Sequence, residues 1–227
     1  SVVFDAHAHC FPPMGVGNTY PEECLKETQY HVRFGRRGFF RRIRDNAPLE
    51  DENILIGGGD GISWLPEINF RIGRFGRVEF THNGEDYYYN LVPASLSDSS
   101  SLPEYMLAQM DYAGVDRAVI QHDRIYGKLD DFLGDCVRRY PNRFVVLAQV
   151  DEWIGGRTDQ LERLRRQIED LGFSGLYFAT GGFFHSDFKI GVNDPALEPL
   201  WDLVAQLEIP IHWYADKLLR PRLEQYL

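Results

Sequence analysis

The chain has 227 residues, which is enough for one large domain with a sizeable hydrophobic core. Hydrophobic residues make up 44% and charged residues 26%, the composition of an ordinary soluble globular protein. The net charge of −10 argues against nucleic acid as a partner, because a polyanion would be repelled. No apolar run is long enough to span a bilayer, so we expect no membrane partner.

Three cysteines, Cys10, Cys24 and Cys136, form an odd and sparse set. Such a set does not predict a disulfide framework and favours a reducing, cytoplasmic setting. Asp5 and two histidines interrupt the first apolar stretch, which therefore does not read as a signal peptide.

The first part of the chain contains one short strand and then an irregular region. Residues 2–7 are apolar and predict a strand that ends in a His-x-His sequence. Residues 10–101 lack helix-strand alternation and predict an inserted region, with a helix over 21–44 that opens with a proline. Asn83-Gly84 lies between two β-rich runs, 77–81 and 86–92, and this dipeptide is typical of a β-hairpin turn.

From residue 102 onward helical and strand patterns alternate regularly. This order is typical of a parallel sheet with right-handed crossovers. The expected helices are 102–113, 130–140, 158–171 and 195–208, the last capped by Asp194. The expected strands are 117–121, 143–150, 175–179 and 209–214.

With the first strand, five parallel strands are expected, and two α/β architectures can use them. An open doubly wound sheet accommodates five strands, whereas a closed (β/α)₈ barrel needs eight and about 250 residues. If the fold is a barrel, its C-terminal strands lie outside these 227 residues or come from another chain. We otherwise expect a single domain over residues 1–227.

The sharpest motif is the pair His7 and His9 at the end of the first strand. Alternate side chains of a strand share a face, so the two imidazoles should point the same way. Parallel α/β folds place their sites at the carboxyl ends of strands. Two adjacent imidazoles can bind one divalent metal, and zinc is the first expectation.

Several segments resemble one family in their order and spacing. "FDAHAH", "MLAQMDYAGVDRAVIQ", "YPNRFVVLAQVD", "LGFSGLYF" and "NDPALEPLWDLVAQLEIPIHWY" are similar to segments of the amidohydrolase-related family. That family includes aminocarboxymuconate-semialdehyde decarboxylase, resorcylate-type decarboxylases and pyrone-dicarboxylate lactonases. The resemblance implies an α/β fold of the amidohydrolase type, a (β/α)₈ TIM barrel that is incomplete at its C-terminal end here and carries the inserted hairpin region after strand 1.

The resemblance also implies a metal held by the paired histidines, by a histidine that ends the fifth strand and by an aspartate that ends the eighth. His212 is the candidate for the fifth-strand ligand. The family's usual spacing after the strand-opening Pro210 points instead to Tyr214, which shares a face of the strand with His212. The eighth-strand aspartate, and a sixth-strand histidine that usually assists, have no counterpart in this sequence.

Further side chains follow strands on the same face and are expected to contact a substrate. His185 follows the fourth strand, and His122 and Arg124 follow the second. An arginine there could bind a substrate carboxylate through two hydrogen bonds. Tyr214 is the remaining candidate for a substrate contact.

The favoured function is a metal-dependent hydrolase acting on a small carboxylated, ring-derived substrate. A nonoxidative decarboxylase on the same scaffold is the alternative, because both chemistries use the histidine pair. A noncatalytic scaffold subunit is the alternative from another class. We also expect the chain to form a homo-oligomer.

Overall fold

The computed structural model describes residues 2–14, 21–35, 39–50, 55 and 61–214. The chain divides into two compact units. The first comprises Ser1–Cys10, Leu102–Asp123 and Leu129–Leu227, and the second comprises Phe11–Ser101 and Arg124–Lys128. The part Phe11–Ser101 of the second unit coincides with the expected inserted region, whereas Arg124–Lys128 lies outside it.

Parallel strands form the centre of the first unit. Three of them pair in the order β1-β6-β7 and two in the order β8-β9. A parallel bridge between Ala148 and Leu176 continues the pairing from the β7 side to β8. The bounds are β1 (Phe4–Ala8), β6 (Arg117–Ile120), β7 (Phe144–Val146), β8 (Leu176–Ala179) and β9 (Ile211–Tyr214).

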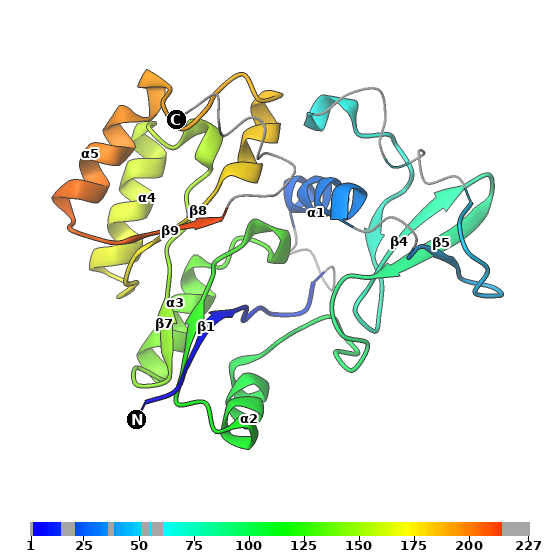
Figure 1. The fold of residues 1–227 in the computed structure, drawn as a ribbon, viewed down its shortest axis with the longest axis horizontal. Coiled ribbons are helices and arrows are strands. Elements are labelled where there is room, and N and C mark those ends of the chain that lie inside the picture. Colours follow the sequence, from blue (N-terminus) through cyan, green and yellow to red (C-terminus); the bar gives the residue numbers. More distant parts are fainter. Residues whose placement is uncertain (1, 15–20, 36–38, 51–54, 56–60, 215–227) are drawn as a thin grey trace. The chain divides into compact units, whose positions relative to one another are not determined.

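These strands confirm the five expected from the sequence, in the spatial order β1-β6-β7-β8-β9. Each crossover carries helical structure, and Figure 1 shows α4 and α5 lying together beside β8 and β9. Within the described part of the chain the strands do not close into an eight-stranded barrel.

The helices of the first unit begin and end where the sequence predicts, to within a few residues. Gly114 ends α2 with a φ of 69°, the left-handed conformation that glycine adopts most readily. Asp194 caps the segment that leads into α5, because its Oδ1 accepts the backbone N–H of Ala196 at 2.9 Å. The bounds are α2 (Pro103–Ala113), α3 (Asp130–Arg139), η4 (Glu152–Ile154), α4 (Thr158–Glu169), η5 (Thr180–Ser186), η6 (Pro195–Leu197) and α5 (Glu198–Gln206).

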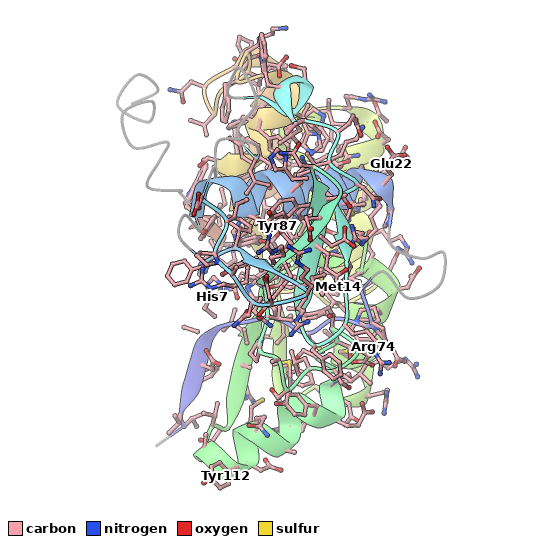
Figure 2. The ribbon with its side chains drawn as sticks, turned by 90° about the vertical axis from the view of Figure 1, so that its right-hand side faces the viewer. His7, Met14, Glu22, Arg74, Tyr87 and Tyr112 are labelled. Atoms are coloured by element: carbon pink, nitrogen blue, oxygen red, sulfur yellow. The ribbon has the colours of Figure 1, made fainter. Side chains whose placement is uncertain are left out.

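The second unit is built around an antiparallel sheet of order β2-β5-β4-β3. The expected hairpin is confirmed, since β4 and β5 pair along their full length and Asn83 and Gly84 turn with φ of 50° and 75°. The elements are α1 (Glu22–Gly35), β2 (Arg41–Arg42), η2 (Ile62–Trp64), β3 (Arg71–Ile72), β4 (Arg77–His82), β5 (Glu85–Asn90) and η3 (Arg124–Tyr126). One face of the sheet packs Phe40, Val78 and Phe80 into a core, against which Tyr87, labelled in Figure 2, also packs.

The helix expected over 21–44 is wrong in its second part. Helix α1 ends at Gly35, and Arg41 and Arg42 pair with Tyr88 and Tyr87 as strand β2. Burial of Phe40 against Phe80 accounts for the difference, because tertiary packing outweighs the local helical preference.

The three cysteines are unpaired by disulfide bonds, as the sequence predicts, and all three are buried. None of the helices described in the structure combines the length and the apolar character needed to cross a bilayer.

Candidate metal site

The paired histidines lie together at the carboxyl end of β1. Their Nε2 atoms are 3.1 Å apart, and the ring centroids are separated by 4.9 Å. His7, labelled in Figure 2, is exposed, and His9 is half-buried. Two nitrogens bound to one tetrahedral zinc ion at 2.0–2.1 Å lie roughly 3.3 Å apart. The observed spacing therefore fits two ligands of a single metal.

The ring of His9 is oriented by the neighbouring strand. Its Nδ1 lies 3.2 Å from the backbone carbonyl oxygen of Gln121, the residue that directly follows β6. A carbonyl only accepts hydrogen bonds, so Nδ1 carries the proton and donates it. In the neutral ring this leaves the lone pair on Nε2, beside Nε2 of His7. Metal-binding histidines are commonly held by the same kind of hydrogen bond.

His212 lies on β9, the last strand in the order β1-β6-β7-β8-β9, yet its ring is close to the histidine pair on β1. Its ring centroid lies 6.2 Å from that of His7. In a flat sheet four strand spacings of about 4.8 Å would put β1 and β9 roughly 19 Å apart. The sheet therefore curls, so that side chains from its first and last described strands meet on the concave face.

Tyr177 of β8 shares this face with His212 and Tyr214. It lies opposite His212 in the register of β8 and β9, and its ring centroid is 5.9 Å from that of His212 and 6.2 Å from that of Tyr214. Tyr177 is buried, whereas Tyr214 is exposed at 36%. The structure thus brings His212 and Tyr214 to one face, as the sequence predicts, and adds a phenol that the sequence did not single out.

His185 stacks on Trp153 in the loops that follow β8 and β7. The ring centroids are 3.7 Å apart, with an angle of 21° between the planes. Glu152, the residue before Trp153, is fully buried, and its Oε1 accepts the backbone N–H of Ala179 at the end of β8. These contacts hold the two loops together, and the predicted contact of His185 with a substrate stays a prediction.

His122 is fully buried, and its Nε2 has a backbone hydrogen-bond partner. Its Nε2 accepts the backbone N–H of Leu129 at 3.1 Å, and its Nδ1 lies 3.6 Å from Asp130 Oδ1. Arg163 donates two hydrogen bonds of 2.7 Å to the same carboxylate, and Gln167 donates a third at 2.8 Å. His122 therefore helps to join the loop after β6 to helices α3 and α4. Its contact with a substrate is untested.

The Asp130 carboxyl titrates below its ordinary range. Burial by itself raises its pKa, but the hydrogen bonds from Arg163 and Gln167 lower the pKa by more than burial raises it, so the net shift is downward. The ionised carboxylate is therefore the form that the fold stabilises.

Arg124 belongs to the second unit, where it forms a buried ion pair. Its Nε lies 2.5 Å from Glu27 Oε1 of α1, and both side chains are less than 10% exposed. The pair compensates the guanidinium charge inside the unit. This contact gives Arg124 a structural role, and the carboxylate-binding role predicted from the sequence stays a prediction.

The imidazoles of His7 and His9 are the donors that fit a metal ion on this face. Within the described residues no group of three or more His, Cys, Asp or Glu side chains is arranged to hold an ion. His7 and His9 nevertheless have the spacing, the ring orientation and the donor chemistry of two ligands of one divalent metal. The pair fits a metal as a partial site, and His212 is the nearest further imidazole on that face.

Comparison with protein families gives one match. The family model described as Amidohydrolase matches residues 4–221, nearly the whole chain. Among curated proteins no match is found.

Solved structures match at low identity. A 5-carboxyvanillate decarboxylase from Novosphingobium aromaticivorans, with bound manganese, is 20% identical; the match covers 54% of this chain and 38% of that one, at a TM-score of 0.39. A probable 2-pyrone-4,6-dicarboxylic acid hydrolase from Acinetobacter baumannii is 17% identical, covering 56% and 45% at 0.40. A 4-oxalomesaconate hydratase from Rhodopseudomonas palustris is 14% identical, covering 94% and 52% at 0.43. The chain spans about half or less of the length of these proteins.

Reasoning from the sequence missed Gln121 and Tyr177. Both lie inside segments used for the family resemblance, Gln121 at the end of an expected strand and Tyr177 in the middle of one. For Gln121 the available signal was a polar residue that ends a parallel strand, since sites gather at that edge.

The Asp130 network generates a prediction about stability. Replacing Asp130 with Asn should lower the free energy of unfolding at pH 7 by about 3 kcal/mol, because Arg163 would remain largely buried without its close carboxylate. The pKa of Asp130 is depressed in the fold, so its contribution is complete above about pH 4 and is lost as the pH falls through the folded pKa. The difference between wild type and variant in urea unfolding should therefore shrink towards pH 2.

Asp131→Asn is the matched control. Asp131 lies next in the chain and pairs with Arg166, but its side chain is 82% exposed. This variant should change stability by less than about 0.5 kcal/mol. Equal losses for the two variants at pH 7 would contradict the role assigned to Asp130.

Proposed function

This chain belongs to the amidohydrolase family, and on that premise we propose that it is a metal-dependent hydrolase acting on a small carboxylated, ring-derived substrate. The relatives named above are enzymes, among them a hydrolase, a hydratase and a decarboxylase. The proposal also includes a (β/α)₈ TIM barrel as the complete architecture and zinc as the metal.

One observation carries the proposal: the Nε2 atoms of His7 and His9 lie 3.1 Å apart, with His9 held by the Gln121 carbonyl. In this arrangement the two imidazoles can share one ion, and His212 approaches on the same concave face. A divalent metal at this point would supply Lewis acidity, which polarises a substrate carbonyl and makes water a better nucleophile.

The remaining side chains of this face suit the binding of a planar substrate. The Tyr177 ring lies against the rings of His212 and Tyr214, and the stacked pair of Trp153 and His185 lies in the loops that follow β7 and β8. We propose His185 and Tyr214 as substrate contacts on this basis. The proposal also includes His122, which is fully buried, and Arg124, which pairs with Glu27, as substrate contacts.

The first test is metal binding by the histidine pair. Dialysed protein should bind one equivalent of Zn²⁺, and His7→Ala and His9→Ala should each weaken binding by more than about 100-fold, since loss of an outer contact alone costs 10–100-fold. Calorimetric titration together with elemental analysis gives both quantities. His82→Ala, which removes a histidine at the tip of the hairpin, is the control and should bind as the wild type does. Unchanged affinity in both site variants would rule out the pair as the metal site.

The second test separates hydrolysis from decarboxylation, which use the same histidine pair. Metal-loaded protein would be incubated with small lactone carboxylates and with hydroxylated aromatic carboxylates. We expect ring opening of a lactone with uptake of one hydroxide equivalent and no release of CO₂. Stoichiometric release of CO₂ from an aromatic carboxylate, with no lactone opened, would replace the hydrolase by the decarboxylase. If neither substrate class reacts although metal is bound, both the hydrolase and the decarboxylase on such substrates are contradicted.

A further inference from the structure

The strand that carries the paired histidines is irregular where they lie. Asp5 pairs with Ala118, but Ala8 pairs with Ile120, so three steps along β1 correspond to two steps along β6. The extra residue forms a bulge at Ala6 and His7. A bulge interrupts the ladder of backbone hydrogen bonds and re-aims nearby side chains. The backbone on either side of His7 therefore needs partners other than the regular ladder.

The side chain of Gln121 supplies such partners. Its Oε1 accepts the backbone N–H of Ala8 at 3.1 Å, and its Nε2 donates to the carbonyl oxygen of Ala6 at 3.2 Å. Gln121 is 2% exposed, so little water competes for these bonds. Its carboxamide therefore hydrogen-bonds to the peptide groups before and after His7, where the bulge interrupts the regular pairing.

The backbone of Gln121 contacts the same segment twice more. Its N–H donates to the carbonyl oxygen of Ala8 at 2.9 Å, and its carbonyl oxygen accepts from Nδ1 of His9 at 3.2 Å. One residue thus fixes the main chain on both sides of His7 and the ring of His9. The position of the main chain around His7 and the orientation of the His9 ring together set the distance between the two metal-binding nitrogens.

We infer that Gln121 is a positioning residue for the metal pair, acting through the bulge in β1. The inference rests on the proposed metal function of His7 and His9. Glutamine suits the task because one side-chain end offers both an acceptor and a donor. Glutamate offers only acceptors when ionised, and methionine has a similar length but offers neither strong acceptor nor donor.

Gln167 provides a matched control elsewhere in the same unit. It is fully buried, and its carboxamide holds the backbone of Gln149 in the same two-way manner, with bonds of 3.0 Å and 3.1 Å. Gln149 is not a proposed ligand. Gln121→Met and Gln167→Met therefore each remove two hydrogen bonds from a carboxamide to the backbone. Only the bonds of Gln121 hold the segment that carries the histidines.

The experiment is a titration with Co²⁺, whose visible absorption reports both affinity and ligand geometry. Gln121→Met should bind Co²⁺ roughly 10–100-fold more weakly than the wild type, the range for contacts that orient metal ligands, and should show altered visible bands. Gln167→Met should retain wild-type affinity and bands, even though its midpoint of urea unfolding falls. Gln121→Glu keeps the acceptor for Ala8 and decides the matter if Gln121→Met does not fold; it should bind at least about tenfold more weakly.

The outcomes separate this inference from the proposed function. If the wild type binds Co²⁺ and the Gln121 variants match its affinity and spectrum, Gln121 is only a structural residue and the metal site stands. If Gln167→Met loses affinity as strongly as Gln121→Met, general loosening of the fold explains both and the inference fails. If the wild type itself does not bind Co²⁺, the metal site fails and the inference fails with it.

Discussion

A hydrogen bond from Nδ1 of His9 to the carbonyl oxygen of Gln121 decides which nitrogen of His9 is available to a ligand. The carbonyl belongs to the residue that directly follows β6, and the parallel pairing of β1 with β6 brings it next to the histidine. Donation from Nδ1 leaves Nε2 facing His7, so the chemistry of the site follows from the pairing of two strands. Without that pairing the ring of His9 would lack the carbonyl that fixes its orientation.

Curvature is the second constraint on the site. His7 and His212 come from the first and last of the five described strands, yet their rings lie 6.2 Å apart. A sheet that curls this far gathers residues from distant parts of the sequence at one point, which a flat sheet of five strands cannot do. The buried network of Asp130, Arg163 and Gln167 joins helices α3 and α4 of the same unit.

Local signals in the sequence predicted the elements that depend on local chemistry. Asn83-Gly84 turns the hairpin because both residues accept a positive φ, and Asp194 caps a helix through its own side chain. His7 and His9 could be singled out because alternation along one strand needs no knowledge of its neighbours. By contrast, Arg41 and Arg42 read as helix but form a strand, since the burial of Phe40 and the pairing with β5 are not local.

The supporting residues of the site depend on register, which a single sequence does not reveal. Tyr177 meets His212 only because β8 and β9 pair in one particular alignment. The Gln121 carboxamide reaches the backbone of Ala6 and Ala8 only in the register that β1 and β6 adopt, with its bulge in β1. His122 was expected to contact a substrate from its place after a strand, yet it is fully buried, and its Nε2 accepts the backbone N–H of Leu129.

The central claim is that Nε2 of His7 and Nε2 of His9 bind one metal ion. A crystal structure of the zinc-loaded protein with an anomalous difference map collected at the zinc edge tests it most directly. The account predicts one peak within about 2.0–2.2 Å of both Nε2 atoms, with Nδ1 of His9 still bonded to the Gln121 carbonyl. A peak bound through Nδ1 of His9, or a peak away from both histidines, would contradict it.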